Sequence, residues 1–233
     1  MNADDGASPR AALRAPTAVR RLRTRLAFAA APSRDIHPSW LPADWPLGHR
    51  RVARLNASGH EALSAWLRST HTLPEVSECF TDAPSLAERL AWIDARDLRR
   101  LSLVCGFMAH RAQFERRDIA PELWRQGRRL QPDLGDFALS RWPGSVALSM
   151  SERSLLQRPQ AIGRLVVLRG YRLMLGCFAA EGDALLRRAR LKFPRRASHD
   201  IVVPLTGARR AVYLELAHMC VIPERFPQWD WLF

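Results

Sequence analysis

The sequence predicts a mainly α-helical protein, a single compact domain of about seven to nine helices with at most a minor edge strand. Apolar residues recur at steps of three and four along several segments, as on the buried face of a helix. The 233 residues are 47% hydrophobic, which is enough to fill one core. Sixteen prolines and eight tryptophans predict short helices, separated by sharp breaks and held by large aromatic side chains.

The first segment, residues 1–25, is rich in Ala, Arg, Pro and Ser and has few large apolar side chains. Such a composition buries too little surface to offset the entropy of ordering. We therefore expect a disordered basic tail, followed by one folded domain over residues 26–233. Prolines and aromatic residues then crowd residues 35–46, which predicts an ordered, extended or single-turn segment lying on the core. We expect Trp40, between flanking prolines, to be buried there as an anchor.

Two capping boxes mark the next helices. In a capping box, a serine hydroxyl accepts a backbone N–H while a glutamate three residues later reaches back to the cap. Ser58-Gly-His-Glu61 predicts a short helix over residues 59–69. Ser85-Leu-Ala-Glu88 predicts a second helix, and its inward stripe consists of Leu86, Leu90 and Ile93.

The strongest helical periodicity follows from Asp94 to Phe114. One apolar stripe consists of Leu98, Leu101, Val104, Cys105, Met108 and Ala112, and a second of Leu103, Phe107 and Phe114. Two neighbouring stripes predict a helix with neighbours on two sides. His110 lies beside the second stripe, which favours a histidine within the core over a catalytic base.

Proline and glycine divide the rest of the chain. Pro121 suits the first turn of a helix reaching Leu130, Pro132 begins a shorter one through Leu139, and residues 141–144 are a stop. The remaining elements that we expect are a central buried helix after Pro159, a short helix over 185–191, an edge strand over 201–204 and a last helix over 207–220. The central helix contains Arg164, Arg169 and Arg172, so it is expected to lie within protein and not within a membrane.

Motifs that carry catalytic or cofactor chemistry are missing. The chain has no Gly-rich phosphate loop, nucleophile elbow or H-E-x-x-H pair, so we expect neither an enzyme nor a cofactor site. The four cysteines, Cys79, Cys105, Cys177 and Cys220, stand far apart without a C-x-x-C pair. They are interpreted as buried thiols, and no metal site is expected.

The formal net charge of +13 comes almost entirely from arginine, because Lys192 is the only lysine. This charge raises the alternative of a basic helical DNA-binding regulator. Its helix-turn-helix would be the helix pair on either side of Gln131-Pro132. Phe137 and Leu139, however, make the second helix apolar where base-reading side chains are required, so nucleic-acid binding is not the leading interpretation.

Several segments, taken in order, resemble one family. They are Leu26–Phe28, Asp35-Ile-His-Pro-Ser-Trp-Leu-Pro42, Leu98–His110, Asp136–Pro143 and the leucine- and arginine-rich Leu185–Pro194. Over residues 26–233 the chain resembles the YscK/SctK family of type III secretion.

The resemblance implies a largely helical, non-catalytic and cytoplasmic adaptor at the cytoplasmic face of the inner membrane, in the sorting platform of the injectisome. Proteins of this family link the cytoplasmic domain of the inner-membrane ring protein to the pod protein. The expected partners are therefore these two proteins, with no cofactor and no small-molecule substrate.

Two groups of residues are candidates for partner binding. Arginine binds carboxylates with a planar fork and loses less hydration than an ammonium group, which suits an acidic partner. The first group lies at the ends of the predicted helix over 94–114 and consists of Arg99, Arg100, Arg116 and Arg117. The second, an apolar anchor, consists of Trp229, Trp231 and Phe233. The alternative for each is a solvated arginine group and a segment folded back onto its own core.

Overall fold

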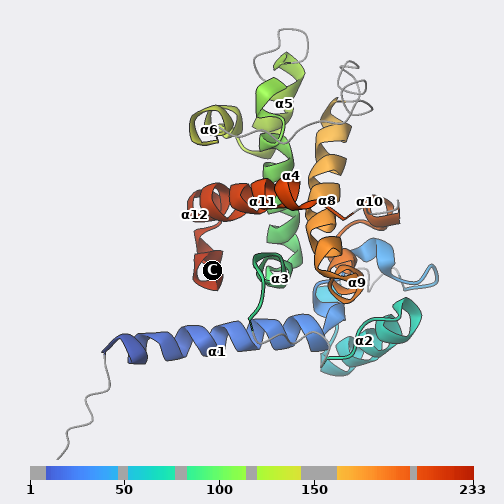
Figure 1. Ribbon diagram of the computed structural model, residues 1–233. Coiled ribbons are helices and arrows are strands. Elements are labelled where there is room, and N and C mark those ends of the chain that lie inside the picture. Colours follow the sequence, from blue (N-terminus) through green and yellow to red (C-terminus); the bar gives the residue numbers. More distant parts are fainter. Residues whose placement is uncertain (1–8, 47–51, 77–82, 114–119, 143–161, 200–203) are drawn as a thin grey trace, which may run out of the picture.

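The computed structural model describes residues 9–46, 52–76, 83–113, 120–142, 162–199 and 204–233 (Figure 1). Within these ranges the protein is helical and contains no strand, which confirms the mainly α class. The α-helices are α1 (Pro9–Ala30), α2 (Ala57–His71), α3 (Leu86–Trp92), α4 (Ala95–Met108), α5 (Ala120–Leu130), α6 (Leu134–Arg141), α8 (Ile162–Glu181), α9 (Asp183–Ala189), α10 (Arg195–His199), α11 (Gly207–Glu215) and α12 (Ile222–Arg225). The described residues thus form eleven α-helices where the sequence predicts seven to nine, and α1, α10 and α12 are the additional ones.

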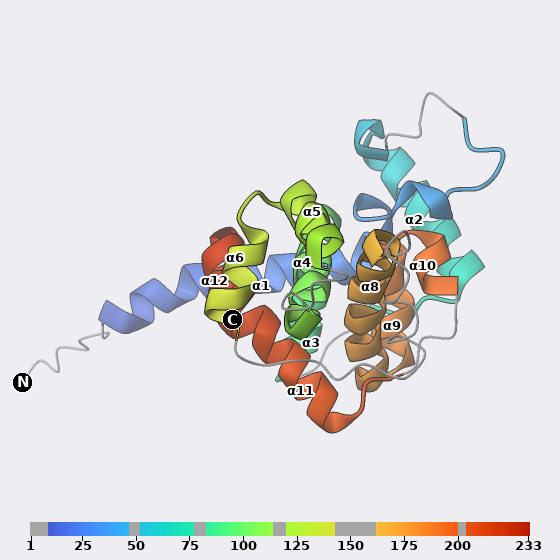
Figure 2. The ribbon, with the colours of Figure 1, turned by 90° about the horizontal axis from the view of Figure 1, so that it is seen from above.

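Helices α4 and α8 lie side by side at the centre, and α11 crosses them (Figures 1 and 2). Their backbones approach closely because two glycines face each other. A Cβ atom on Gly106 would lie 2.3 Å from Cα of Gly170. The Tyr213 hydroxyl of α11 donates a hydrogen bond to the Gly170 carbonyl at 3.3 Å. The predicted central helix therefore does lie at the middle of the core, and α4 has neighbours on more than one side.

Of the two predicted capping boxes, the one at Ser85 is confirmed, and α4 begins at Asp94 as its periodicity predicts. Ser85 and Glu88 form both hydrogen bonds of a capping box at α3, and the Asp94 side chain caps α4 by accepting the Asp97 N–H. The prediction at Ser58 is wrong, because Asn56 caps α2 by accepting the Gly59 N–H at 2.8 Å. Asn56 has an extended backbone and a short side-chain carbonyl, so it meets the same need two residues earlier.

The helix over residues 207–220 continues further than expected. After α11 the chain forms a π-helical turn over Leu216–Val221 and then α12. Pro223 lies at the start of α12 and has no N–H to donate. A wider π turn just before the proline lets the chain continue in the same direction despite the lost hydrogen bond.

Helix α1 corrects the expected disordered tail from Pro9 onward, since it runs continuously through the predicted domain boundary at residue 26. It lies along one side of the molecule, and its first turns extend beyond the body (Figure 2). Phe28 and Ala29 bury its end, and Arg21 donates to the Trp231 carbonyl at 3.0 Å. The predicted disorder is wrong over this range for two reasons. Ala, Arg and Leu are strong helix formers, and the stems and guanidinium groups of arginines also make packing contacts.

After α1 come two single turns, Pro32–Arg34 and Pro38–Trp40, and the second lies within residues 35–46, where the sequence predicts an ordered extended or single-turn segment. Trp40 is 6% exposed and donates from Nε1 to the Phe193 carbonyl at 2.8 Å, which confirms it as a buried anchor. It belongs to a small second core beneath α2, separate from the main core around α4 and α8. The strand expected over 201–204 lies outside the described residues except for Pro204, which is irregular.

Candidate protein-binding surfaces

The structure separates the predicted arginine group. Arg99, at the first turns of α4, donates from Nη1 to the Lys192 carbonyl at 2.6 Å and is partly buried. Arg100 is exposed, with its guanidinium carbon 6.0 Å from the centre of the Phe226 ring. Arg116 and Arg117 lie outside the described residues. Of the described pair, then, Arg100 faces solvent while Arg99 holds two elements of the fold together.

The predicted aromatic anchor lies against the protein's own core. Trp229 donates from Nε1 to Oδ2 of Asp97 at 2.8 Å, and the Phe233 ring lies 5.1 Å from the His218 ring. Trp231 lies under the Arg20 guanidinium, 4.0 Å from the ring centre. Burial acts to raise the pKa of Asp97, but the hydrogen bonds from Trp229 and from Gln228 outweigh it and lower that pKa. These contacts agree with the alternative interpretation, in which the segment with Trp229, Trp231 and Phe233 folds back onto the protein's own core.

A buried charged cluster, not anticipated from the sequence, joins the first segment to the later helices. We name Phe28, Asp35, Arg188 and Lys192 the Lys192 cluster. The Lys192 ammonium is fully buried, 3.1 Å from Oδ2 of Asp35, and donates to the Ile93 carbonyl at 2.6 Å. Arg188 donates from Nε to the Phe28 carbonyl at 2.5 Å, and both cations lie over the Phe28 ring.

Within the Lys192 cluster, Lys192 and Asp35 shift each other's pKa values. Burial lowers the pKa of Lys192, and the nearby Asp35 carboxylate only partly offsets this effect. Burial alone would raise the pKa of Asp35, but the charge and hydrogen bond of Lys192 hold it below its usual value. The only sequence signal for this site was that Lys192 is the sole lysine, and nothing in its spacing indicated a partner.

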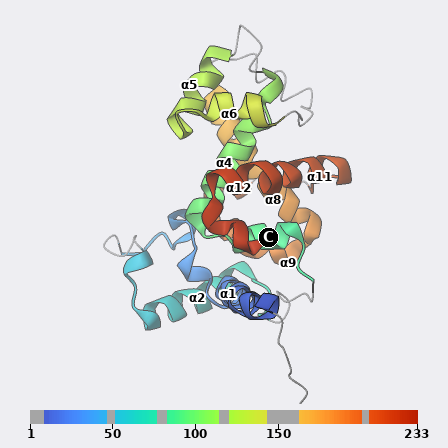
Figure 3. The same ribbon diagram turned by 90° about the vertical axis from the view of Figure 1, so that its left-hand side faces the viewer.

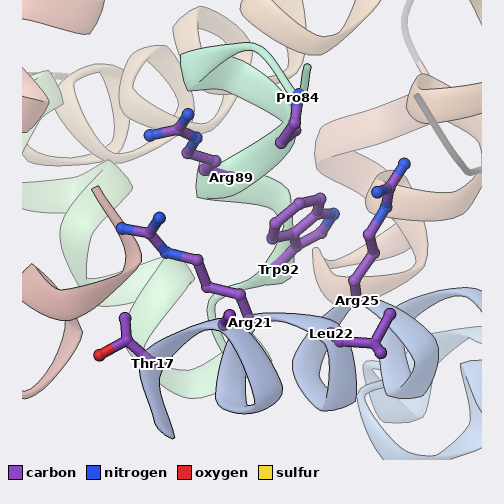
Figure 4. A pocket seen from close by; sticks show the side chains of 8 residues that line it. Thr17, Arg21, Leu22, Arg25, Pro84, Arg89 and Trp92 are labelled. Carbon is purple, nitrogen blue, oxygen red and sulfur yellow. The ribbon is translucent and has the colours of Figure 1, made fainter. Parts of the chain in front are cut away.

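A groove of about 730 Å³ lies between α1 and α3 (Figure 4). The side chains along it are Thr17, Ala18, Arg21, Leu22, Arg25, Pro84, Arg89 and Trp92. Trp92 lies in the middle, with Arg89 and Pro84 on one side and the α1 side chains on the other (Figure 4). The Arg25 guanidinium carbon is 5.5 Å from the centre of the Trp92 ring. Among the described residues that line the groove, three are arginines and none carries a carboxylate.

Two of the three groove arginines, Arg21 and Arg89, donate hydrogen bonds to the last residues of the sequence. Arg21 donates from Nε and Nη2 to the Trp231 carbonyl, at 3.2 and 3.0 Å. Arg89 donates from Nη1 to the Phe233 carbonyl at 3.1 Å. These contacts hold the guanidinium groups in place before any partner arrives, so less side-chain entropy is lost on binding. The sequence did not indicate this groove, because a disordered tail, which it predicts for residues 1–25, would not supply the α1 wall.

The remaining candidates for chemistry lie in the core. Burial raises the pKa of Cys105 well above its usual value and that of Cys177 to about 12, so both remain protonated thiols at neutral pH. Cys220 is partly exposed, and Cys79 lies outside the described residues. His110 is fully buried at the end of α4, as expected of a core histidine. No three His, Cys, Asp or Glu side chains gather as a metal site in the described part of the chain.

Within the described ranges, no helix has both the length and the apolar character needed to cross a membrane. No known protein family, curated protein or solved structure matches the chain. The proposed function therefore rests on the surface features and on the sequence resemblance.

Proposed function

We propose that this chain is a non-enzymatic adaptor of the type III secretion sorting platform, linking the cytoplasmic domain of the inner-membrane ring protein to the pod protein. The observation that carries the proposal is that four of the five segments resembling the YscK/SctK family contact one another. The His37 N–H donates to the Leu191 carbonyl at 2.7 Å, and Trp40 donates to the Phe193 carbonyl. The segment over 35–42 thus packs directly on that over 185–194.

Two further resembling segments meet at the same place. Phe28 contacts Arg188 and Lys192, and Arg99 of α4 donates to the Lys192 carbonyl. Each motif is short and apolar, so each alone says little. Their convergence on residues 185–194 makes them one structural unit, and a family resemblance that follows a structural unit is stronger support than the same motifs scattered over the surface.

The arrangement of the helices also suits an adaptor. Helices α5 and α6 lie at one end of α4, while α1 and α2 lie at the other (Figures 1 and 3). Both ends expose arginines: Arg20 and Arg23 on α1, and Arg125, Arg128 and Arg129 on α5. Two acidic partners can therefore bind without competing for one surface.

The test is reconstitution with the ring-protein cytoplasmic domain and the pod protein of the same organism. We expect the two to co-elute in size-exclusion chromatography with light scattering only when this chain is present. The chain alone should bind each partner with a dissociation constant in the range of about 0.1–10 μM, typical of dynamic assemblies. Failure to bind either protein, together with steep salt-dependent and sequence-selective DNA binding, would replace the proposal with a DNA-binding role.

A further inference from the structure

Helix α1 carries an exposed apolar stripe. Four large hydrophobic side chains are exposed in the described part of the protein, and three of them are on α1: Val19 at 49%, Leu22 at 51% and Leu26 at 42%. Their spacing of three and four residues puts them on one face of the helix. Single exposed leucines are ordinary, but three on one helical face form a continuous strip that solvates poorly.

The stripe runs into the groove between α1 and α3. Leu22 belongs to both, because it lines the groove and is half exposed on the helix surface. Trp92 is 5% exposed and forms the apolar floor, with Pro84 beside it. Together, the stripe and the groove form a ridge next to a hollow, the shape against which an amphipathic helix packs its own apolar face.

Among the described residues that line the groove, every charged side chain is an arginine. Helix α1 contains no acidic residue, and its Arg21 and Arg25 line the groove beside the stripe. Arg89 adds a further guanidinium from α3. Any occupant that buries its apolar side chains here must place its polar edge among these arginines, and carboxylates are the groups that meet them with charge-assisted hydrogen bonds.

From this combination we propose that the α1–α3 groove and the adjoining Val19/Leu22/Leu26 stripe dock an acidic amphipathic helix of a partner protein. A flat anionic lipid surface would also attract a basic amphipathic helix. A flat surface cannot reach into a hollow of about 730 Å³ whose floor is Trp92, whereas leucine or phenylalanine side chains projecting from a helix can enter it. The inference concerns the chemistry of the occupant and holds whether or not the chain acts in type III secretion.

The test uses the full chain and a fluorescently labelled synthetic peptide of about 18 residues, long enough to form a helix on binding. Leucines occupy one face of the peptide and glutamates the rest, and a matched peptide replaces every glutamate with glutamine. Fluorescence anisotropy at low salt should give saturable binding of the acidic peptide with a dissociation constant of about 1–50 μM. The glutamine peptide should bind at least about tenfold more weakly.

Two variants and a charge-matched control locate the site. Arg21→Glu/Arg25→Glu should weaken binding by at least about tenfold, and Arg128→Glu/Arg129→Glu on α5, which changes the net charge equally, by less than about threefold. Because Arg21 and Arg25 also make internal contacts, Leu22→Ser is the second variant: its side chain is half exposed, so folding should be unchanged while binding falls. Circular dichroism and the melting temperature confirm the fold of each.

The contrary outcomes are distinct. If the groove variant and the α5 control weaken peptide binding equally, the attraction is unspecific and the proposal is wrong. The absence of saturable binding at about 100 μM peptide would also overturn it. Co-sedimentation with phosphatidylserine vesicles that Leu22→Ser abolishes, without peptide binding, would assign the surface to a membrane. The reconstitution with the ring and pod proteins is measured separately, so a failure of the peptide test and a failure of the proposed function can be told apart.

Discussion

At the scale of single residues, Lys192 shows how one buried charge can organise contacts that are distant in sequence. Its ammonium group lies between the Asp35 carboxylate and the Ile93 carbonyl, with no exposed surface. A buried pair adds little net stability over an apolar replacement, but removing one partner leaves the other uncompensated. Replacing only one member of the Lys192–Asp35 pair should therefore lower the free energy of unfolding more than replacing both.

We predict that Lys192→Met lowers the free energy of unfolding by about 2–4 kcal/mol, because it leaves the Asp35 carboxylate without its counter-ion. The Asp35 side chain is 25% exposed, so its unpaired carboxylate costs less free energy than a fully buried one would. Lys192→Met/Asp35→Asn should recover at least about half of the loss. Urea unfolding of the three variants measures both values. A single variant as stable as the parent would show that the pair holds nothing together.

Trp40 is the second residue-scale case, and here the sequence was informative. We predict that Trp40→Ala costs about 3–5 kcal/mol, since it removes a buried ring and its hydrogen bond to the Phe193 carbonyl. Trp40→Phe keeps most of the apolar volume and should cost about 1–2 kcal/mol. Chemical denaturation distinguishes the two. Equal and small losses would mean that the ring lies on the surface and not in the second core.

At the scale of elements, the crossing of α4 and α8 depends on two glycines. We predict that Gly106→Ala destabilises the protein by about 2–4 kcal/mol, because the added Cβ would meet backbone atoms of Gly170, which cannot move aside as a side chain can. Gly207→Ala at the first turn of α11 is the matched control, since nothing lies within 4 Å of its added Cβ. Thermal unfolding should separate the variants clearly, and similar melting temperatures would contradict the close approach.

Helix α2 gives the fold a dependence on pH. His71, at its end, contacts the Trp40 and Trp66 rings edge-on. Burial, aided by nearby arginines, lowers the pKa of His71 and likewise that of His37 below the usual 6.5. The unfolded chain therefore binds protons more readily than the folded protein as the pH falls through 6.5, and stability must decline.

The corresponding prediction is that the melting temperature falls between pH 7.5 and pH 5.5. Carboxylates such as Asp35 and Asp97, whose pKa values are lowered from 3.8, stay ionised in both states over this window and contribute little. His71→Gln should make the pH dependence shallower, because one of the two histidines no longer titrates. An unchanged slope in this variant would assign the acid sensitivity to other groups.

At the scale of the whole molecule, the sequence predicted what depends on local pattern and missed what depends on distant partners. The caps at Ser85 and Asp94, the break after Arg141 and the central helix after Pro159 all follow from neighbouring residues. Helix α1 did not, because its order comes from contacts with Trp231 and Arg188, which lie at the other end of the sequence. Two of the predicted partner-binding features, Arg99 and the aromatic group, likewise make contacts within the protein. Sequence spacing does not predict such contacts.

The separation of the two basic ends leads to the last prediction. If the ring and pod proteins bind opposite ends, charge reversal at one end should affect one partner only. We expect Arg20→Glu/Arg23→Glu on α1 to weaken one association by about tenfold and Arg128→Glu/Arg129→Glu on α5 to weaken the other, each leaving the remaining partner within about twofold. These arginines are exposed, so the melting temperature should change little, and least for the α5 variant, because Arg20 also lies over the Trp231 ring.

Binding of each partner to each variant, measured by isothermal titration calorimetry at two salt concentrations, decides the matter. Losses that also shrink at high salt would identify the contacts as charge pairs at the rim of an interface. If both variants weaken the same partner, the two proteins share one surface, and a chain that bridges them would have to do so as an oligomer, because one surface cannot hold two partners at once. Light scattering of the chain alone would then test that consequence directly.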